Sequence, residues 1–391
     1  MLICLGVVLS LMTWFSATAV LPELSTHYSL TASESAWLTS AVQLGFALGA
    51  LLSSMLALSD RWPLTRLMAG ATLLAGCANA ILLLEVNAET AIAARFLTGA
   101  ALAGIYPPAV KLVATWFKTH RGLAVGIMVG ALTLGSAMPY LVRAGGSELP
   151  WRDVLATCSL ASFAAAGIFG WLLREGPHAF ARATIDLRQT GAILRNRPVM
   201  LANLGYFGHM WELYAMWSWF LVYVTNTRMI GPDLHIAALI TFSVIASGAI
   251  GCLSGGWLAD RIGRCNTTIL MMALSGISAV FIGVFHAGPL WLFLTIAIVW
   301  GFSVVGDSAQ FSAAVTELTD SHLVGSSLAF QMSVGFAITM ITIWLVPHIA
   351  DALGSWRWSF LVLVPGPLLG IAAMLLLRRE ERAQRMAGGL R

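Results

Sequence analysis

The stretch GWLADRIGRC, residues 256–265, places three charged residues within ten positions, between two long apolar runs. Charge is scarce elsewhere, because only 10% of the residues are charged, against about 25% in a typical soluble domain. The stretch LALSDRWPLT at 56–65 carries the same Asp-Arg pair 200 positions earlier and contains no glycine. Two related charged turns between apolar runs indicate a duplicated chain embedded in a membrane.

The apolar runs predict the fold class. The chain has 391 residues, of which 58% are hydrophobic, and its mean hydropathy is +0.82. Runs of about 20 apolar residues, enough for an α-helix to cross about 30 Å of hydrocarbon, recur from end to end, whereas the short alternating strands of a membrane barrel do not. We expect an all-α membrane protein with twelve transmembrane helices near residues 3–21, 35–57, 65–84, 91–115, 122–142, 153–173, 198–224, 236–258, 267–286, 290–315, 324–348 and 358–377. The first run lacks the basic leader and cleavage site of a signal peptide, so we expect it to be retained as a span.

The loops between these spans predict the orientation, because loops on the cytoplasmic side carry an excess of Lys and Arg. One side collects sixteen basic residues, and the other side holds only Arg143, Arg152, Arg228 and Arg357. Both termini and the stretch 256–265 are therefore expected in the cytoplasm, and the short loops favour a bacterial inner membrane. The net charge of +4 borders the membrane, so it does not indicate a nucleic-acid partner.

A repeat divides the chain into two homologous parts. Asp60-Arg61 recurs as Asp260-Arg261, Gly99 and Gly104 recur as Gly301 and Gly306, and Trp151-Arg152 recurs as Trp356-Arg357, with offsets of 200, 202 and 205. Because the offsets drift in one direction, we infer two six-helix bundles in parallel orientation. We place them at 1–174 and 198–377, joined by a polar cytoplasmic linker at 175–197 and followed by a basic cytoplasmic tail at 378–391.

These motifs resemble those of the major facilitator superfamily of secondary transporters, and the resemblance covers nearly the whole chain. The family's loop signature G-x-x-x-D-R-x-G-R is present as Gly256, Asp260, Arg261, Gly263 and Arg264. Its fourth-span R-x-x-x-G is present as Arg95 and Gly99, and its fifth-span R-G-x-A-x-G is similar to KTHRGLAVGIMVG at 118–130. The region 115–127 is loosely similar to the nitrate/cyanate and monocarboxylate branches.

The resemblance implies that the loop residues form a conformational latch. Asp260 would face the helix start at Arg121-Gly122 and Asp60 the helix start at 324–326, while basic loop residues such as Arg61 would meet acidic groups nearby; these contacts would close the cytoplasmic side. A helix N-terminus favours a carboxylate through its free N–H groups. In the first copy Leu56 and Pro63 replace the glycines, so its latch should hold less well. The alternative is that both loops are only tight turns that fix topology.

An ionisable residue near the centre of a span costs roughly 2.5–3.5 kcal/mol on insertion scales, and five charged residues in spans 4, 7 and 10 or at their ends need a reason; they are Arg95, Lys111, Glu212, Asp307 and Glu317. The resemblance implies that spans 1, 4, 7 and 10 line the central cavity, which makes all but Glu317 candidates for the substrate or proton pathway. His209 lies one turn from Glu212 on span 7, so the two could carry a coupling proton. Alternatively, they pair to lock span 7 to a neighbour.

The remaining candidates have equally open roles. Arg95 matches the family's span-4 arginine, which is associated with proton movement or anion contact. Lys111 follows a double proline that should bend span 4, and it either binds an anion or reaches the cytoplasmic surface. Asp307 replaces Ile105 of the first half and is either a coupling acid or the ion-pair partner of Lys111 or Arg95. Polar or stacking contacts could come from Trp14, Gln43, Tyr106, Trp217, Gln310 and Gln331, although ordinary packing is the alternative for each.

Glycine and cysteine patterns complete the sequence reading. Gly122, Gly126 and Gly130 form a GxxxG series on which the halves could rock. The five cysteines show no CxxC or Cys/His spacing, so we expect no disulfide framework, metal site or cofactor. The motifs GxxxxGK[ST], HExxH and GxSxG do not occur, so neither ATP-driven transport nor an enzyme is indicated.

The sequence therefore predicts a proton-coupled secondary transporter that works by alternating access, as a monomer in the lipid bilayer. Arg95 and Lys111 favour a small organic or inorganic anion as the substrate. The aromatic residues of span 7 with Glu212 would instead suit efflux of a lipophilic cation. A receptor that binds a small molecule without transporting it is an alternative of another class.

Overall fold

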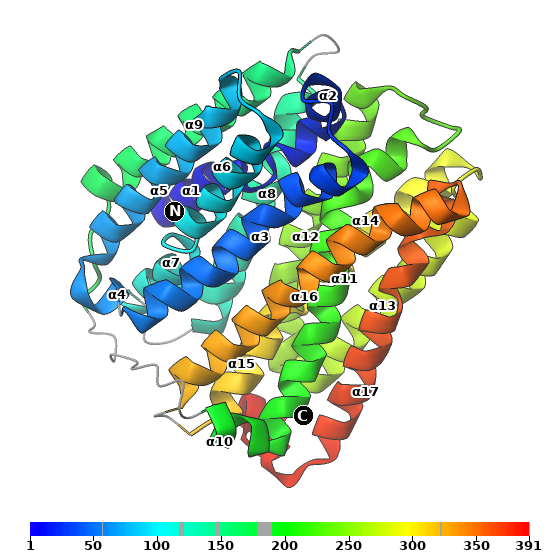
Figure 1. Cartoon of the computed structure of the whole chain (residues 1–391). Coiled ribbons are helices and arrows are strands. Elements are labelled where there is room, and N and C mark those ends of the chain that lie inside the picture. The colour runs from blue at the N-terminus through cyan, green and yellow to red at the C-terminus, as the bar shows by residue number, and fades with distance from the viewer. Residues whose placement is uncertain (57, 117–120, 146–148, 178–189, 321–322, 391) are drawn as a thin grey trace.

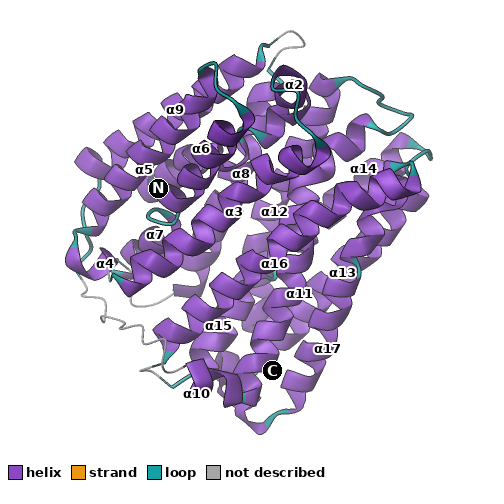
Figure 2. Ribbon diagram, viewed as in Figure 1, coloured by secondary structure: helices purple, strands orange, loops and turns teal. Residues whose placement is uncertain are grey.

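The protein was analysed as a computed structural model, which describes all residues except 57, 117–120, 146–148, 178–189, 321–322 and 391. The side chains of 60, 114, 121–125, 190 and 192 also lie outside the description. The described residues form helices and loops without a strand (Figure 2). The all-α prediction is therefore confirmed.

The N-terminal half consists of α1 (Leu2–Phe15), η1 (Thr18–Val20), α2 (Leu21–His27), α3 (Ala32–Met55), α4 (Leu58–Arg61), α5 (Leu64–Ala80), η2 (Ile81–Leu83), α6 (Ala88–Leu102), α7 (Tyr106–Ala114), α8 (Arg121–Arg143), α9 (Trp151–Gly167) and η3 (Ile168–Leu172). The C-terminal half consists of α10 (Thr190–Arg195), α11 (Arg197–Thr225), α12 (Leu234–Ile262), α13 (Arg264–Val284), α14 (Leu290–Gly306), α15 (Ser308–Leu318), α16 (Val324–Leu353), η5 (Trp356–Leu363), α17 (Pro365–Arg379) and η6 (Glu381–Gly389). The two halves lie side by side (Figure 1).

The helices match the predicted spans. Among the described residues, ten helical segments are long and apolar enough to cross a membrane, and α1 with η1 and α2, bent by 47°, makes an eleventh. The twelfth predicted span is α11, whose 29 residues extend over about 1.5 Å each. It is less apolar because it carries tryptophans, tyrosines, His209 and Glu212. The arrangement is consistent with twelve spans in two bundles.

Two spans are broken near the middle. Pro107 and Pro108 lie in the first turn of α7, where proline is tolerated because the first N–H groups have no partner within the helix. The bend predicted there begins at Ala103, just before α7. The corresponding break of the second half lies at Asp307, between α14 and α15, and no proline marks it.

Close helix pairs show the repeat in three dimensions. A Cβ atom at Gly99 would overlap the carbonyl oxygen of Val42, and one at Gly301 would overlap that of Val244. Both pairs therefore need glycine for close backbone approach, α6 against α3 and α14 against α12. The two sites are 202 residues apart on each partner. The duplication inferred from sequence is thus matched by equivalent helix contacts.

The halves meet along two helix pairs, α8 with α12 and α3 with α16. On α8, a Cβ atom at Gly126 would lie 3.6 Å from the carbonyl oxygen of Cys252, and one at Gly130 would lie 3.4 Å from that of Ala249. These two glycines therefore lie at the boundary between halves with room for ordinary contact. Gly122 lies outside the described side chains, and the rocking role of the series stays a prediction.

Candidate functional site

The centre of the C-terminal half contains a buried ion pair. Nδ1 of His209 on α11 lies 2.9 Å from Oδ1 of Asp307, and the two side chains are only 1% and 2% exposed. The imidazole lies between the rings of Tyr206 and Phe311, with centroids 5.9 Å and 5.6 Å away. Its second nitrogen, Nε2, has no hydrogen-bond partner among the described residues. Oδ1 of Asp307 also lacks a hydrogen-bond partner among these residues, so the pair leaves buried polar positions open on both side chains.

Glu212 lies one turn further along α11 and is held differently. Nε1 of Trp300 donates to its Oε1 at 2.7 Å, and the hydroxyl of Ser275 donates to its Oε2 at 2.8 Å. Because both oxygens accept a hydrogen bond, the carboxylate links α11 to α13 and α14. His209 and Glu212 do not pair with each other, so the predicted lock uses Trp300 and Ser275 instead.

The side chain of Arg95 on α6 is fully buried and donates hydrogen bonds to the C-terminal end of α1. Its guanidinium donates to the carbonyl oxygen of Thr13 at 2.8 Å, to that of Trp14, and to Oδ1 of Asn79 at 3.2 Å. The last carbonyls of a helix have no partner within it and carry partial negative charge, so a cation is favourable there. The hydroxyl of Ser16 also binds Asn79, at 2.5 Å. Arg95 therefore stabilises the bend between α1 and α2.

Lys111 lies elsewhere on the same broken span. Its Nζ donates to the carbonyl oxygen of Ser59 at 3.1 Å, next to the first charged loop. Neither Lys111 nor Arg95 contacts Asp307, whose ion-pair partner is His209. The sequence alternative that Asp307 neutralises one of these cations is therefore wrong in this structure, where Asp307 pairs with His209 instead.

An aromatic cluster lies where the two halves meet, and we call it the interface cluster. Trp14 packs against Phe46 at 4.8 Å, Tyr214 at 5.6 Å and Phe336 at 6.0 Å between ring centroids. Phe15 and Trp217, whose rings lie 5.9 Å apart, join the cluster through Tyr214, at 6.3 Å and 5.7 Å. The members come from α1, α3, α11 and α16, so rings of both halves close the middle of the protein.

Two further candidates differ in their surroundings. Gln331 on α16 donates to Oδ1 of Asn203 at 3.1 Å and accepts from the hydroxyl of Ser312 at 3.0 Å. Both the oxygen and the nitrogen of its amide are thus hydrogen-bonded within the C-terminal half. Tyr106 begins α7 and is half-buried.

The charged loop of the second half is ordered around a left-handed glycine. Gly263 has φ +89° between α12 and α13, a conformation that side chains other than glycine rarely adopt. The guanidinium of Arg264 binds both oxygens of Glu317, at 2.8 Å and 2.5 Å, and Oε1 of Gln310 at 2.8 Å. Oε2 of Glu317 also accepts from the backbone N–H of Ala387 in η6 at 3.1 Å. The ionisable Glu317 is therefore a partner of the loop.

The latch residues are only partly described. Arg261 stacks on Trp257 at 4.0 Å, and both Arg61 and Asp260 are exposed. Asp260 makes no hydrogen bond or ion pair to the described residues, while Gly256 lies in the last turns of α12. The side chains of Asp60 and of the first turn of α8 lie outside the description, so the latch stays a prediction.

The partners of Glu212 were not found in the sequence. Trp300 stands seven residues before Asp307, which is two helical turns and hence the same face of span 10. That spacing could have indicated Trp300 as a partner for an ionisable residue of span 7. No pattern in the sequence singled out Ser275, or Asn79, the partner of Arg95, because single polar residues occur throughout these spans.

Known proteins resemble the chain over most of its length. It is 23% identical over 403 residues to the 4-hydroxybenzoate transporter PcaK of Pseudomonas aeruginosa, which covers 91% of this chain and 87% of PcaK. It is also 23% identical to the 3-(3-hydroxy-phenyl)propionate transporter of Escherichia coli, over 91% of this chain and 88% of that protein. The membrane sensor protein UhpC of Escherichia coli is 22% identical, over 69% of this chain and 66% of the sensor.

Solved structures share this fold over nearly the whole chain. A bacterial homologue of the human lysosomal transporter Spinster, in an inward-facing and occupied conformation, superposes with a TM-score of 0.74 at 15% identity, covering 97% of this chain and 96% of that chain. The sequence profile of the Major Facilitator Superfamily matches residues 3–231 and 212–389. With its many apolar helices, the family's loop signature and a profile match over nearly the whole chain, this multi-pass membrane protein belongs to the major facilitator superfamily of transporters.

Proposed function

We propose that the protein is a proton-coupled secondary transporter of small organic anions, and specifically of aromatic carboxylates. The observation that carries the proposal is the buried His209–Asp307 pair beside Glu212 in the middle of the C-terminal half. The bundles at 1–174 and 198–377 rock about this centre. The protein works as a monomer in the bacterial inner membrane with both termini in the cytoplasm, as the loop charges favour.

The aromatic carboxylate is favoured by two observations. The interface cluster offers ring faces from both halves, and aromatic pairs gain about 0.5–1.5 kcal/mol beyond burial. PcaK and the phenylpropionate transporter are named for acids that join a ring to a carboxylate. Arg95 does not supply the countercharge, because its guanidinium is buried against backbone carbonyls. His209, with Nε2 open, supplies it when protonated.

The coupling proton is carried by the same pair. Asp307 lies against Nδ1 of His209, which leaves Nε2 as the other ring nitrogen, so a protonated imidazole offers Nε2–H as a donor to a substrate carboxylate. The other titratable groups around the pair are Glu212 and Tyr206 on α11 and Cys252 on α12. Glu212 is held by two donors and acts as a positioning residue for α11.

The test uses purified protein in liposomes. With an inward proton gradient, 4-hydroxybenzoate should accumulate, and a collapsed gradient should abolish accumulation but leave counterflow. Asp307→Asn should retain counterflow, lose its pH dependence and lose accumulation. Glu212→Gln, the matched neutral substitution one turn away, should lower the amount of folded protein while keeping the dependence on the gradient. Accumulation that is unaffected by the gradient, together with unchanged pH dependence in Asp307→Asn, would contradict proton coupling.

The alternatives give different results in the same experiment. Efflux of a lipophilic cation would appear as gradient-driven extrusion of a cationic dye and no uptake of acids. A sensor, favoured by the similarity to UhpC, would bind an acid without counterflow.

A further inference from the structure

The boundary between the halves holds buried polar atoms that lack hydrogen-bond partners. Among the described residues, these include the indole nitrogens of Trp14 and Trp217, the hydroxyl of Ser136, and both Oε1 and Nε2 of Gln43. All four side chains are no more than 2% exposed. Leaving such a group unpaired costs about 1–3 kcal/mol, so each needs a physical reason.

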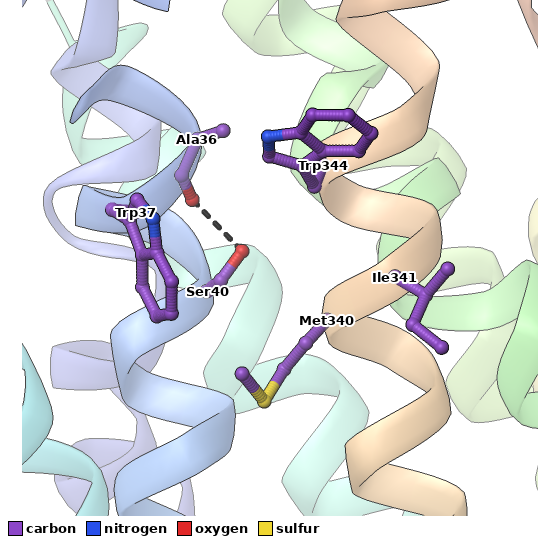
Figure 3. Close-up of a pocket in the computed structure, with 6 residues that line it drawn as sticks. All are labelled: Ala36, Trp37, Ser40, Met340, Ile341 and Trp344. Atoms are coloured by element: carbon purple, nitrogen blue, oxygen red, sulfur yellow. Dashed lines mark hydrogen bonds between the residues drawn. The ribbon is translucent and has the colours of Figure 1, made fainter. Parts of the chain in front are cut away.

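Gln43 lies on the face of α3 that meets the other half. With about 100° per residue, its direction falls between those of Phe46 and Ser40. The ring of Phe46 contacts Phe336 of α16 at 4.6 Å. Ser40 lines an apolar groove of 270 Å³ between α3 and α16, flanked by Trp37 and Trp344 (Figure 3). The amide of Gln43 is therefore enclosed beside the interface cluster.

Gln331 shows that the protein can satisfy a buried amide. It is equally buried, yet it both donates to Asn203 and accepts from Ser312 inside the C-terminal half. Other buried polar atoms without a partner, such as the hydroxyl of Thr72 and Nε2 of His286, lie within one half, whereas those of Trp14, Gln43, Ser136 and Trp217 belong to α1, α3, α8 and α11. The contacts between the halves are the ones that separate when the halves rock.

We propose that Gln43 and Trp14 form a subsite that binds a ring hydroxyl of the substrate. The inference rests on the proposed transport of aromatic carboxylates and names the chemistry that selects among them. A phenolic hydroxyl both donates and accepts, and the Gln43 amide offers one acceptor and two donors. The indole N–H of Trp14 adds a donor, and the rings of Phe46, Tyr214 and Phe336 enclose the aromatic face of the substrate.

The subsite and the His209 pair are linked by α11. Tyr214 of the interface cluster lies five residues beyond His209 on this helix, about 7.5 Å along its axis and about 140° around it. The proposed function assigns the carboxylate of the substrate to His209, and Gln43 with Trp14 binds the hydroxyl when the halves part.

The test compares 4-hydroxybenzoate with benzoate in liposomes. A site built to bind a hydroxyl discriminates against the analogue that lacks it, so wild-type protein should have a half-saturation concentration for benzoate at least about tenfold higher. Gln43→Leu should raise the value for 4-hydroxybenzoate about tenfold and leave benzoate unchanged, which removes the preference. Trp14→Phe keeps a ring and loses the N–H, so it should reduce the preference about threefold. Gln331→Leu, the matched control, should leave the ratio unchanged.

Each outcome decides a separate point. If wild-type protein takes up neither acid, the proposed function fails and the subsite fails with it. If it takes up both acids equally, or if Gln43→Leu and Trp14→Phe keep the wild-type ratio, the hydroxyl subsite alone is wrong. If Gln43→Leu does not fold, as judged by size-exclusion chromatography, the ratio in Trp14→Phe decides.

Discussion

The hydroxyl of Tyr140 on α8 donates a hydrogen bond to the backbone carbonyl oxygen of Trp217 on α11, 3.0 Å away, and so joins the two halves. Tyr223 is a matched counterpart within one half, since its hydroxyl lies 3.2 Å and 3.1 Å from the carbonyl oxygens of Ile282 and Arg357 and shares its one hydrogen between these acceptors. Both tyrosines are fully buried. One bond crosses the boundary between the halves and the other does not.

Tyr140→Phe should therefore shift the protein towards states in which this contact is open. Loss of one hydrogen bond costs about 1 kcal/mol, which is roughly a fivefold change in the ratio of the two states. Cysteine labelling at positions flanking the contact, or distance measurements between spin labels on α8 and α11, would report the shift. Tyr223→Phe should lower thermal stability without changing the labelling; an equal effect on labelling would contradict the assignment of Tyr140 to the boundary.

Arg95→Lys should destabilise the protein although it keeps the charge. A guanidinium can reach the carbonyls of Thr13 and Trp14 and the amide of Asn79 together, whereas an ammonium lacks the planar fork. We expect a loss of about 2–3 kcal/mol, seen as a lower midpoint of thermal unfolding in detergent. If Arg95 served only as a mobile charge for protons or anions, Arg95→Lys would keep wild-type stability.

Two glycines on inter-helix contacts should respond differently to alanine. A methyl group at Gly255 would overlap the carbonyl oxygen of Gly306, while one at Gly126 would sit 3.6 Å from that of Cys252. Gly255→Ala should cost about 3 kcal/mol or more, because the α12–α14 pair must separate. Gly126→Ala should change stability by less than about 0.5 kcal/mol. Thermal unfolding of both variants in the same detergent checks the contrast, and a large loss in Gly126→Ala would contradict it.

His286, between α13 and α14, should make stability depend on pH. Burial, reinforced by the positive charges of Arg357 and Arg228, lowers the pKa of its imidazole below the ordinary value. The folded state then binds fewer protons than the unfolded state, so stability is full above about pH 6.5 and falls as the pH drops below that value. His286→Gln should flatten this part of the unfolding midpoint plotted against pH. A variant with the wild-type slope would exclude His286 as the cause.

The spans and the duplication could be predicted from sequence because a bilayer imposes a length and an apolar composition on each crossing helix. The bend near Pro107 was also predictable, because proline interrupts the hydrogen bonds of a helix. The break at Asp307 and its ion pair with His209 were not, since both depend on how helices far apart in sequence rotate and pack against each other. Arg95 illustrates the limit most clearly. Its motif marked it as important, but only the fold shows that backbone carbonyls of α1 are its partners.

The separation of buried charge between the halves bears on the membrane potential. Arg95 keeps its positive charge and is bonded within the N-terminal half, so its contribution is the same in every cycle. On the proposed mechanism the coupling proton is carried by the pair of His209 and Asp307, which belongs to the C-terminal half. One elementary charge crossing 100 mV is worth about 2.3 kcal/mol, so on that mechanism the membrane potential acts on the proton while the C-terminal half holds it.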